Sequence, residues 1–128
     1  MLDIAHKYKF VRGVVGFIPL DRTAEAARAL KIFSKDNYFK GVRNLTHNYA
    51  DKKYESDDKW ILRPAVLDTL AIVEESGLAF DYVVVNEAHL ANVSILAKKF
   101  PRLKIVIDHF GKPNILSLIH ISEPTRPY

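Results

Sequence analysis

Short apolar segments alternate with longer amphipathic segments along most of the chain. The apolar segments are β-branched or apolar through their middles, which is the pattern of parallel strands buried on both faces. The pattern predicts strands at residues 11–18, 39–45, 79–85 and 104–108. Apolar positions with helical spacing follow the first three of these strands. The repeated unit is therefore a strand followed by a helix.

Three helices are predicted from apolar positions that recur on one face. Asp21 or Thr23 is available as the cap of the first helix. The second helix opens at Pro64 and stops at Gly77, and the third ends before Pro101. Residues 1–8 could be the remnant of an earlier helix. The positions expected to be buried are Ala26, Leu30 and Phe33 in the first helix, Val66, Leu67, Leu70 and Val73 in the second, and Leu90, Val93, Leu96 and Phe100 in the third.

Strands that alternate with helices imply right-handed crossovers and a parallel sheet. Four strands fit a piece of a closed barrel and a small open sheet equally well. The segment at residues 46–59 is long and polar, and it follows the carboxyl end of the second strand. A long loop in that place is often functional, although a solvated insertion is the alternative.

The composition excludes several classes of protein. The 128 residues include 19 basic and 15 acidic side chains, which gives a formal net charge of +4. The basic residues are scattered among acidic ones, so no basic stripe indicates a nucleic-acid partner. The sequence has no cysteine, which rules out disulfides and thiolate metal sites. No apolar run could span a bilayer and the start lacks the pattern of a secretion signal, so we expect a cytoplasmic protein with no membrane partner.

The segment KIVIDHFGKP, at residues 104–113, carries the strongest functional signal. Its apolar strand ends in Asp108 and His109, and Gly111 and Pro113 then break the regular pattern. Ionisable groups at the carboxyl end of a buried parallel strand often mark an active site. A histidine can bind zinc, polarise a carbonyl group or move a proton near neutral pH. His109 is therefore the first candidate for chemistry, and the alternative is a histidine that merely ends a strand.

Four motifs occur in order: GVVGFIPL at residues 13–20, KGVRNL at 40–45, WILRPAVLDTL at 60–70 and FPRLKIVIDHFGKP at 100–113. Together they resemble the amidohydrolase-related family (amidohydrolase family 2) of predicted metal-dependent hydrolases, in the branch with sugar-lactone and dicarboxylate-lactone hydrolases. The resemblance extends over nearly all of residues 1–114. It implies an α/β fold in which residues 1–115 form the central part of a (β/α)8 TIM barrel, with about four parallel strand-helix units and no closure.

The resemblance also implies a hydrolase that opens a sugar lactone or a related cyclic ester by attack of water on the carbonyl. The four strands would be the third to sixth of the barrel. The family's His-x-His pair does not occur in this sequence, and its late-strand aspartate would follow the last strand found here. We therefore expect the isolated chain to be inactive. One divalent, zinc-like metal is expected only in the full-length parent, and some members of the branch are thought to work without a metal.

Two residues are candidate catalytic groups by this resemblance. His109 matches the histidine of the family's D-H-x-G-K-P motif, which implies a metal ligand or a hydrogen-bond donor to the substrate carbonyl. Arg43 matches an arginine of the family at the carboxyl end of the second strand. It could clamp a substrate carboxylate or stabilise an oxyanion, and a buried structural salt bridge is the alternative. By strand alternation Asp108 should point away from His109 and satisfy groups outside the barrel.

Weaker candidates for binding the small-molecule lactone or ester lie near the same strand ends. Lys112 belongs to the motif of His109, His47 follows the second strand, and His89 follows the third. Each could instead be a solvated or purely structural residue. Trp60, which opens the third motif, is expected to pack the long loop against the barrel wall rather than to bind a substrate.

The last residues, 116–128, differ from the rest of the chain. Residues 116–126 resemble a read-through translation of the adaptor used in transposon-based short-read library preparation. We therefore expect residues 116–128 to be a non-native tail that takes no part in the fold. The alternative is a genuine Pro-rich arm.

A second hypothesis for the whole chain belongs to another functional class. It is a small open α/β binding module without catalysis, similar to a response-regulator or flavodoxin-type sheet. Such a module would be complete in itself and would show no exposed apolar edge. A slice of a barrel should instead expose unpaired edge strands.

Overall fold

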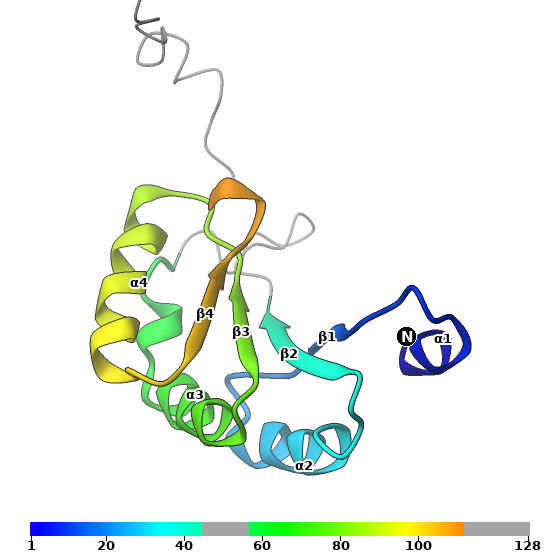
Figure 1. Ribbon diagram of the computed structural model, residues 1–128. Coiled ribbons are helices and arrows are strands. Elements are labelled where there is room, and N and C mark those ends of the chain that lie inside the picture. The colour runs from blue at the N-terminus through cyan, green and yellow to red at the C-terminus, as the bar shows by residue number, and fades with distance from the viewer. Residues whose placement is uncertain (45–56, 112–128) are drawn as a thin grey trace, which may run out of the picture.

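The computed structural model describes residues 1–44 and 57–111 and confirms the predicted alternation of strands and helices (Figure 1). The predicted strands are all present, and each is shorter than its prediction. In chain order the elements are α1 (Leu2–Lys7), β1 (Val14–Phe17), α2 (Thr23–Phe33), β2 (Phe39–Asn44), η1 (Trp60–Leu62), α3 (Pro64–Ser76), β3 (Ala79–Tyr82), α4 (Glu87–Lys99), β4 (Lys104–Ile107) and η2 (Asp108–Gly111).

Local sequence explains where the helices begin and end. Pro64 occupies the first turn of α3, and Gly77 ends it with a left-handed backbone at φ 70°, as predicted. The predicted cap of α2 is wrong, because the N-cap residue is Arg22 and its side chain makes no capping hydrogen bond. Thr23 already lies inside α2, and its hydroxyl donates to the carbonyl oxygen of Ala65 in α3 at 2.9 Å.

The inward face of α4 also differs from its prediction. Leu96 is fully buried as expected, but Leu90 is exposed. The polar side chains of His89 and Asn92 lie inside instead. A helix can turn a polar face inward when partners are available there, and Asn92 donates from Nδ2 to the carbonyl oxygen of Asp58 at 2.6 Å.

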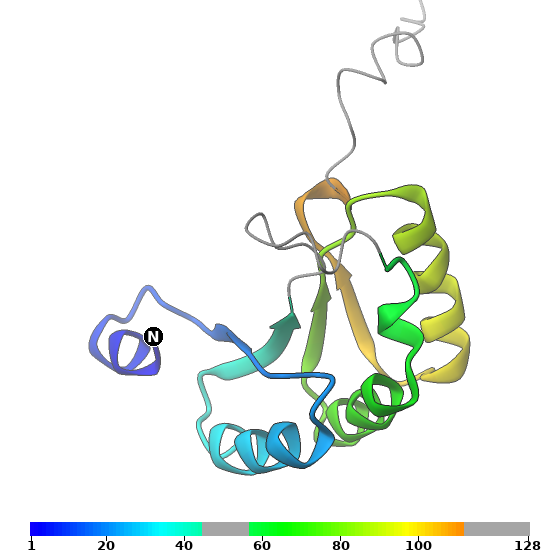
Figure 2. The same ribbon diagram turned by 180° about the vertical axis from the view of Figure 1, so that it is seen from behind.

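The four strands form one parallel sheet in the order β1-β2-β3-β4. Figures 1 and 2 show α2, α3 and α4 along the same side of this curved sheet. Sequential parallel strands with right-handed crossovers keep all their helices on one side, as in a barrel. A doubly wound sheet reverses its strand order and carries helices on both faces. The chain is therefore part of a (β/α) barrel, and the order does not fit the alternative of a complete flavodoxin-type module.

The two faces of the sheet have different surroundings. Val42 and Phe80, which are partners in register on β2 and β3, are fully buried against the helices. The main apolar core lies on this face and includes Leu30 of α2, Leu70 of α3 and Leu96 of α4. Trp60 is buried in the same core, and most of the long loop that it was expected to pack lies outside the described residues.

Residues on the opposite face of the sheet are partly open to solvent. Phe17 of β1 is 65% exposed and Val106 of β4 is 49% exposed. Parallel sheets are normally covered on both faces, so this open face corresponds to the interior of the barrel. Arg43 and Asp81 lie on the same face, one residue along from the buried Val42 and Phe80.

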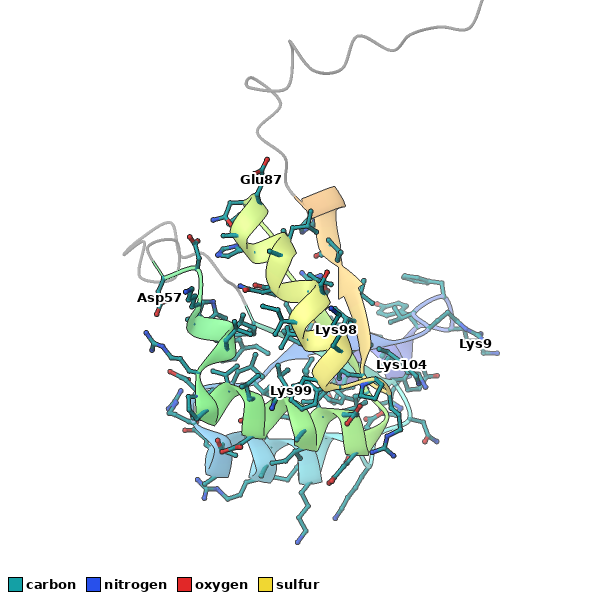
Figure 3. The ribbon with its side chains drawn as sticks, turned by 90° about the vertical axis from the view of Figure 1, so that its left-hand side faces the viewer. Lys9, Asp57, Glu87, Lys98, Lys99 and Lys104 are labelled. Atoms are coloured by element: carbon teal, nitrogen blue, oxygen red, sulfur yellow. The ribbon has the colours of Figure 1, made fainter. Side chains whose placement is uncertain are left out.

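The charged residues of α4 are arranged with an acidic residue at its start and basic residues at its end. Glu87 stands in its first turn, and Lys98 and Lys99 stand in its last turn (Figure 3). This arrangement complements the helix dipole. In the part of the chain that the structure describes, no helix is long and apolar enough to cross a membrane.

Candidate active site

Arg43 sits at the carboxyl end of β2, directly beside Asp81 of β3. The two residues are partners in the parallel register, so their side chains emerge on the same face. The guanidinium Nε donates to Asp81 Oδ2 at 2.8 Å, and Nη2 donates to the same oxygen. Asp81 is buried, whereas the Arg43 side chain is 38% exposed. The arginine therefore has a buried anchor and an accessible edge.

Asp108 binds the same guanidinium from the next strand end. Its Oδ2 lies 2.6 Å from Nη2 of Arg43, so the arginine stands between two carboxylates. The expectation that Asp108 points outside the barrel is wrong. Strand alternation no longer applies at this position, because β4 ends at Ile107 and Asp108 opens the 3₁₀ turn η2. The turn directs the carboxylate back over the open face of the sheet.

His109 follows Asp108 with a left-handed backbone, at φ 51°. Its backbone N–H donates to Asp108 Oδ1 at 2.8 Å, and its ring Nε2 lies 3.0 Å from Asp108 Oδ2. Within the described residues Asp108 Oδ2 has no hydrogen-bond partner, so its contacts with Arg43 and His109 are ion-pair contacts rather than hydrogen bonds. Left-handed backbone is uncommon for residues other than glycine, and such positions cluster at functional sites. The sequence-predicted pair Arg43 and His109 is thus brought together, with Asp108 between them.

The three weaker candidates do not join this group. Lys112 and His47 lie outside the described residues. His89 is fully buried near the start of α4, where Nδ1 accepts from the backbone N–H of Val85 at 3.4 Å and Nε2 lies 3.3 Å from Asp58 Oδ1. Its ring stands 6.3 Å from the ring of Tyr82. Tyr82 and Asp81 are successive strand residues on opposite faces, so His89 lies on the helix-covered side and away from Arg43.

A polar network around His89 fastens the segment before η1 to α4. Asn86 caps the helix by accepting from the backbone N–H of His89 at 2.7 Å. Its Nδ2 donates to Asp58 Oδ1 at 2.8 Å. Burial raises the pKa of the neighbouring Tyr82 hydroxyl to about 12. These contacts support a structural role for His89 rather than the predicted contact with a substrate.

Asp81 is the residue that sequence reasoning missed. A signal was present, because the strand AFDY at residues 79–82 contains one charged side chain among apolar and aromatic ones. A charge in a buried strand needs a partner, and strand alternation would have placed it beside Arg43. Within this cluster the guanidinium of Arg43 is the group that could donate to a developing negative charge, and it lies close to a histidine.

Residues 1–44 and 57–111 offer few side chains that could bind a metal ion together. No group of three or more histidine, cysteine, aspartate or glutamate side chains there could hold a metal ion. The Nε2 atom of His109 lies 3.0 Å from Asp108 Oδ2, and the same carboxylate oxygen lies 2.6 Å from Nη2 of Arg43. These side chains alone do not fit a zinc-like ion, because such a site needs at least three protein ligands.

The chain is similar to a known protein family and to a curated enzyme. The family described as Amidohydrolase matches residues 1–123 of the chain. An L-fucono-1,5-lactonase of Burkholderia ambifaria is 35% identical over 117 residues, which cover 91% of the chain and 38% of that lactonase. The chain thus spans less than half the length of this curated relative. No solved structure gives a significant match.

Proposed function

Because the chain belongs to the amidohydrolase family, we propose that it is the central part of a hydrolase that opens a sugar lactone. Residues 1–115 would supply the third to sixth units of the barrel, and residues 116–128 would take no part in it. The observation that carries the proposal is the cluster of Arg43, Asp108 and His109 at the carboxyl ends of β2 and β4. In barrel enzymes this end of the strands holds the catalytic groups.

The reaction requires a donor for the oxygen that becomes negative. Attack of water on the lactone carbonyl forms a new C–O bond and places charge on the carbonyl oxygen. Arg43 can donate to that oxygen, and a guanidinium remains charged at every relevant pH. Fixed donors of this kind are typically worth about 10²–10³ in rate.

The reaction also requires a group that moves protons. A neutral ring nitrogen of His109 can accept a proton from the attacking water, and Asp108 Oδ2 places a carboxylate 3.0 Å from Nε2 of the same ring. The ring C–O bond then breaks, and the same proton passes to the leaving oxygen. The product is an open-chain hydroxy acid. His109 thus serves first as a base and then as an acid.

The substrate proposed is a sugar 1,5-lactone, by the similarity to the L-fucono-1,5-lactonase. Lys112 and His47 remain proposed contacts to this small molecule, whereas the position of His89 argues against that role. In a complete barrel a divalent, zinc-like ion could use His109 only together with ligands from outside the described residues. We further propose that the isolated chain is inactive, because the rest of the barrel mouth is needed.

A chimera tests this function. The matching 117 residues of the Burkholderia ambifaria lactonase would be replaced by those of this chain, and opening of L-fucono-1,5-lactone would be followed with a pH indicator against a protein-free blank. We expect turnover by the chimera and none by the isolated chain. Arg43→Gln and His109→Gln should each lower kcat/KM by about 10²-fold or more.

The matched control is Arg63→Gln. Arg63 also pairs with an aspartate through Nη2, but its partner is Asp57 on the surface. This variant should keep full activity. A folded chimera that opens no sugar lactone, or an Arg43→Gln chimera as active as the Arg63→Gln one, would refute the proposed function.

A further inference from the structure

One carboxylate oxygen connects the two candidate catalytic groups. Oδ2 of Asp108 lies 2.6 Å from Nη2 of Arg43 and 3.0 Å from Nε2 of His109. The two donors come from different elements, β2 and η2. This oxygen accepts a hydrogen bond from neither group within the described residues, so both are ion-pair contacts, and a shared ionic partner still keeps the two groups close together. Asp108 is therefore placed to set the relative position of Arg43 and His109.

Only some of the N–H groups of the Arg43 guanidinium contact the two carboxylates. A guanidinium has one N–H on Nε and two on each Nη. Nε and Nη2 both donate to Asp81 Oδ2, and Nη2 also faces Asp108. Among the contacts of the described residues, this leaves both N–H groups of Nη1 for another acceptor. The arginine side chain is 38% exposed, so that edge can reach a bound molecule.

The pairing is not the one that best satisfies the carboxylate of Asp81. A fork-to-fork pair would use both carboxylate oxygens. Here Oδ2 takes two donors, while the buried Oδ1 has no hydrogen-bond partner within the described part of the chain. Leaving a buried acceptor unpaired is unfavourable, so the arrangement is not explained by stability alone. It is explained if the orientation of Arg43 is what matters.

We propose that Asp108 is a positioning residue: it holds Arg43 and His109 together, while Asp81 anchors Arg43, so that Nη1 of Arg43 and Nδ1 of His109 face the same substrate carbonyl. This inference rests on the proposed function for the identity of the substrate. The coupling of the two side chains through Asp108 can be measured without any turnover.

Side-chain NMR of the full 128-residue chain, labelled with ¹⁵N, tests the coupling. The Nη1 and Nη2 signals of Arg43 should be resolved, because the carboxylates slow rotation of the guanidinium. His109 should carry its proton on Nε2. Asp108→Ala should speed the Arg43 exchange about tenfold or more and let the Nδ1–H tautomer of His109 appear. Asp81→Ala should release Arg43 and leave the His109 tautomer unchanged.

The control variant is Asp36→Asn. Asp36 binds Nε2 of His6 on the surface, and this pair is 21% and 57% exposed, against 21% and 55% for Asp108 and His109. The variant should leave the signals of Arg43 and His109 as they are in the unmodified chain. The Asp36→Asn variant shows whether an effect requires loss of the Asp108 carboxylate or follows from loss of any aspartate beside a histidine.

Two results would overturn the proposal. One is an unmodified chain in which the Arg43 Nη signals are already averaged or His109 already shows both tautomers. The other is an Asp108→Ala variant in which neither side chain changes. If Asp108→Ala does not fold, Asp108→Asn has the same shape without the charge and should speed the Arg43 exchange. Coupled signals in a protein that opens no lactone would leave the positioning role standing and refute only the proposed function.

Discussion

The one-sided core makes a quantitative prediction about two phenylalanines. Phe80 on β3 faces the helices and is 0% exposed, whereas Phe17 on β1 is 65% exposed on the open face. Phe80→Ala removes a fully buried ring and should cost about 3–5 kcal/mol of unfolding free energy. Phe17 buries only about a third of its ring, so Phe17→Ala should cost about a third of the 1.5–3 kcal/mol of full burial, or roughly 0.5–1 kcal/mol.

Urea unfolding followed by fluorescence measures both values. Trp60 is the only tryptophan of the chain and lies in the core, so its emission reports directly on unfolding. With a slope of about 1–3 kcal/mol per molar urea, Phe80→Ala should shift the midpoint by about 1 M or more. Single domains have only about 5–15 kcal/mol of stability, so Phe80→Leu is the milder substitute if Phe80→Ala is unfolded without urea.

The losses of unfolding free energy in the two variants decide whether the face of the sheet around Phe17 is open to solvent. Equal losses for Phe17→Ala and Phe80→Ala would mean that the face of the sheet around Phe17 is covered in solution. That result would refute the description of this face as an open barrel interior. A small loss for Phe17→Ala, measured at low protein concentration, is the expected outcome.

Three further predictions concern other parts of the fold. Gly41→Ala should destabilise the chain by about 1–3 kcal/mol in urea unfolding, because the new Cβ would lie 2.7 Å from a backbone oxygen of β3, and an unchanged urea midpoint would contradict this reasoning. Between pH 10 and 12 the unfolded chain loses the Tyr82 proton while the folded chain keeps it, so stability should fall as pH rises through this window, and less so in Tyr82→Phe. Asn86→Ala removes the cap of α4 and should cost about 0.5–2 kcal/mol by the same assay, and an unchanged midpoint would show that the bond to the His89 N–H contributes nothing.

Much of the fold could be predicted because strands and helices have different periods. Apolar runs located every strand, and Pro64 and Gly77 marked the ends of α3 correctly. The cap of α2 is Arg22, which was not among the predicted candidates Asp21 and Thr23, and the Thr23 hydroxyl instead donates to a carbonyl oxygen of α3. That contact joins residues far apart in the sequence, which local rules do not see.

The site shows the same division between local and long-range information. Arg43 and His109 were located from their places at strand ends together with the resemblance to the family's motifs, and in the structure both contact Asp108. The direction of Asp108 was mispredicted because alternation holds only inside a strand, and the left-handed backbone of His109 breaks it. The side on which His89 lies depends on the path from β3 into α4, and no periodicity describes that path.

Both flanks of residues 45–56 are secured to the barrel wall. On one side Asn44 Nδ2 donates to the carbonyl oxygen of Ile18 at 3.2 Å, and on the other Asn92 Nδ2 donates to the carbonyl oxygen of Asp58 at 2.6 Å. The positions at which residues 45–56 leave and rejoin the described part of the chain are therefore fixed by contacts that lie outside those residues.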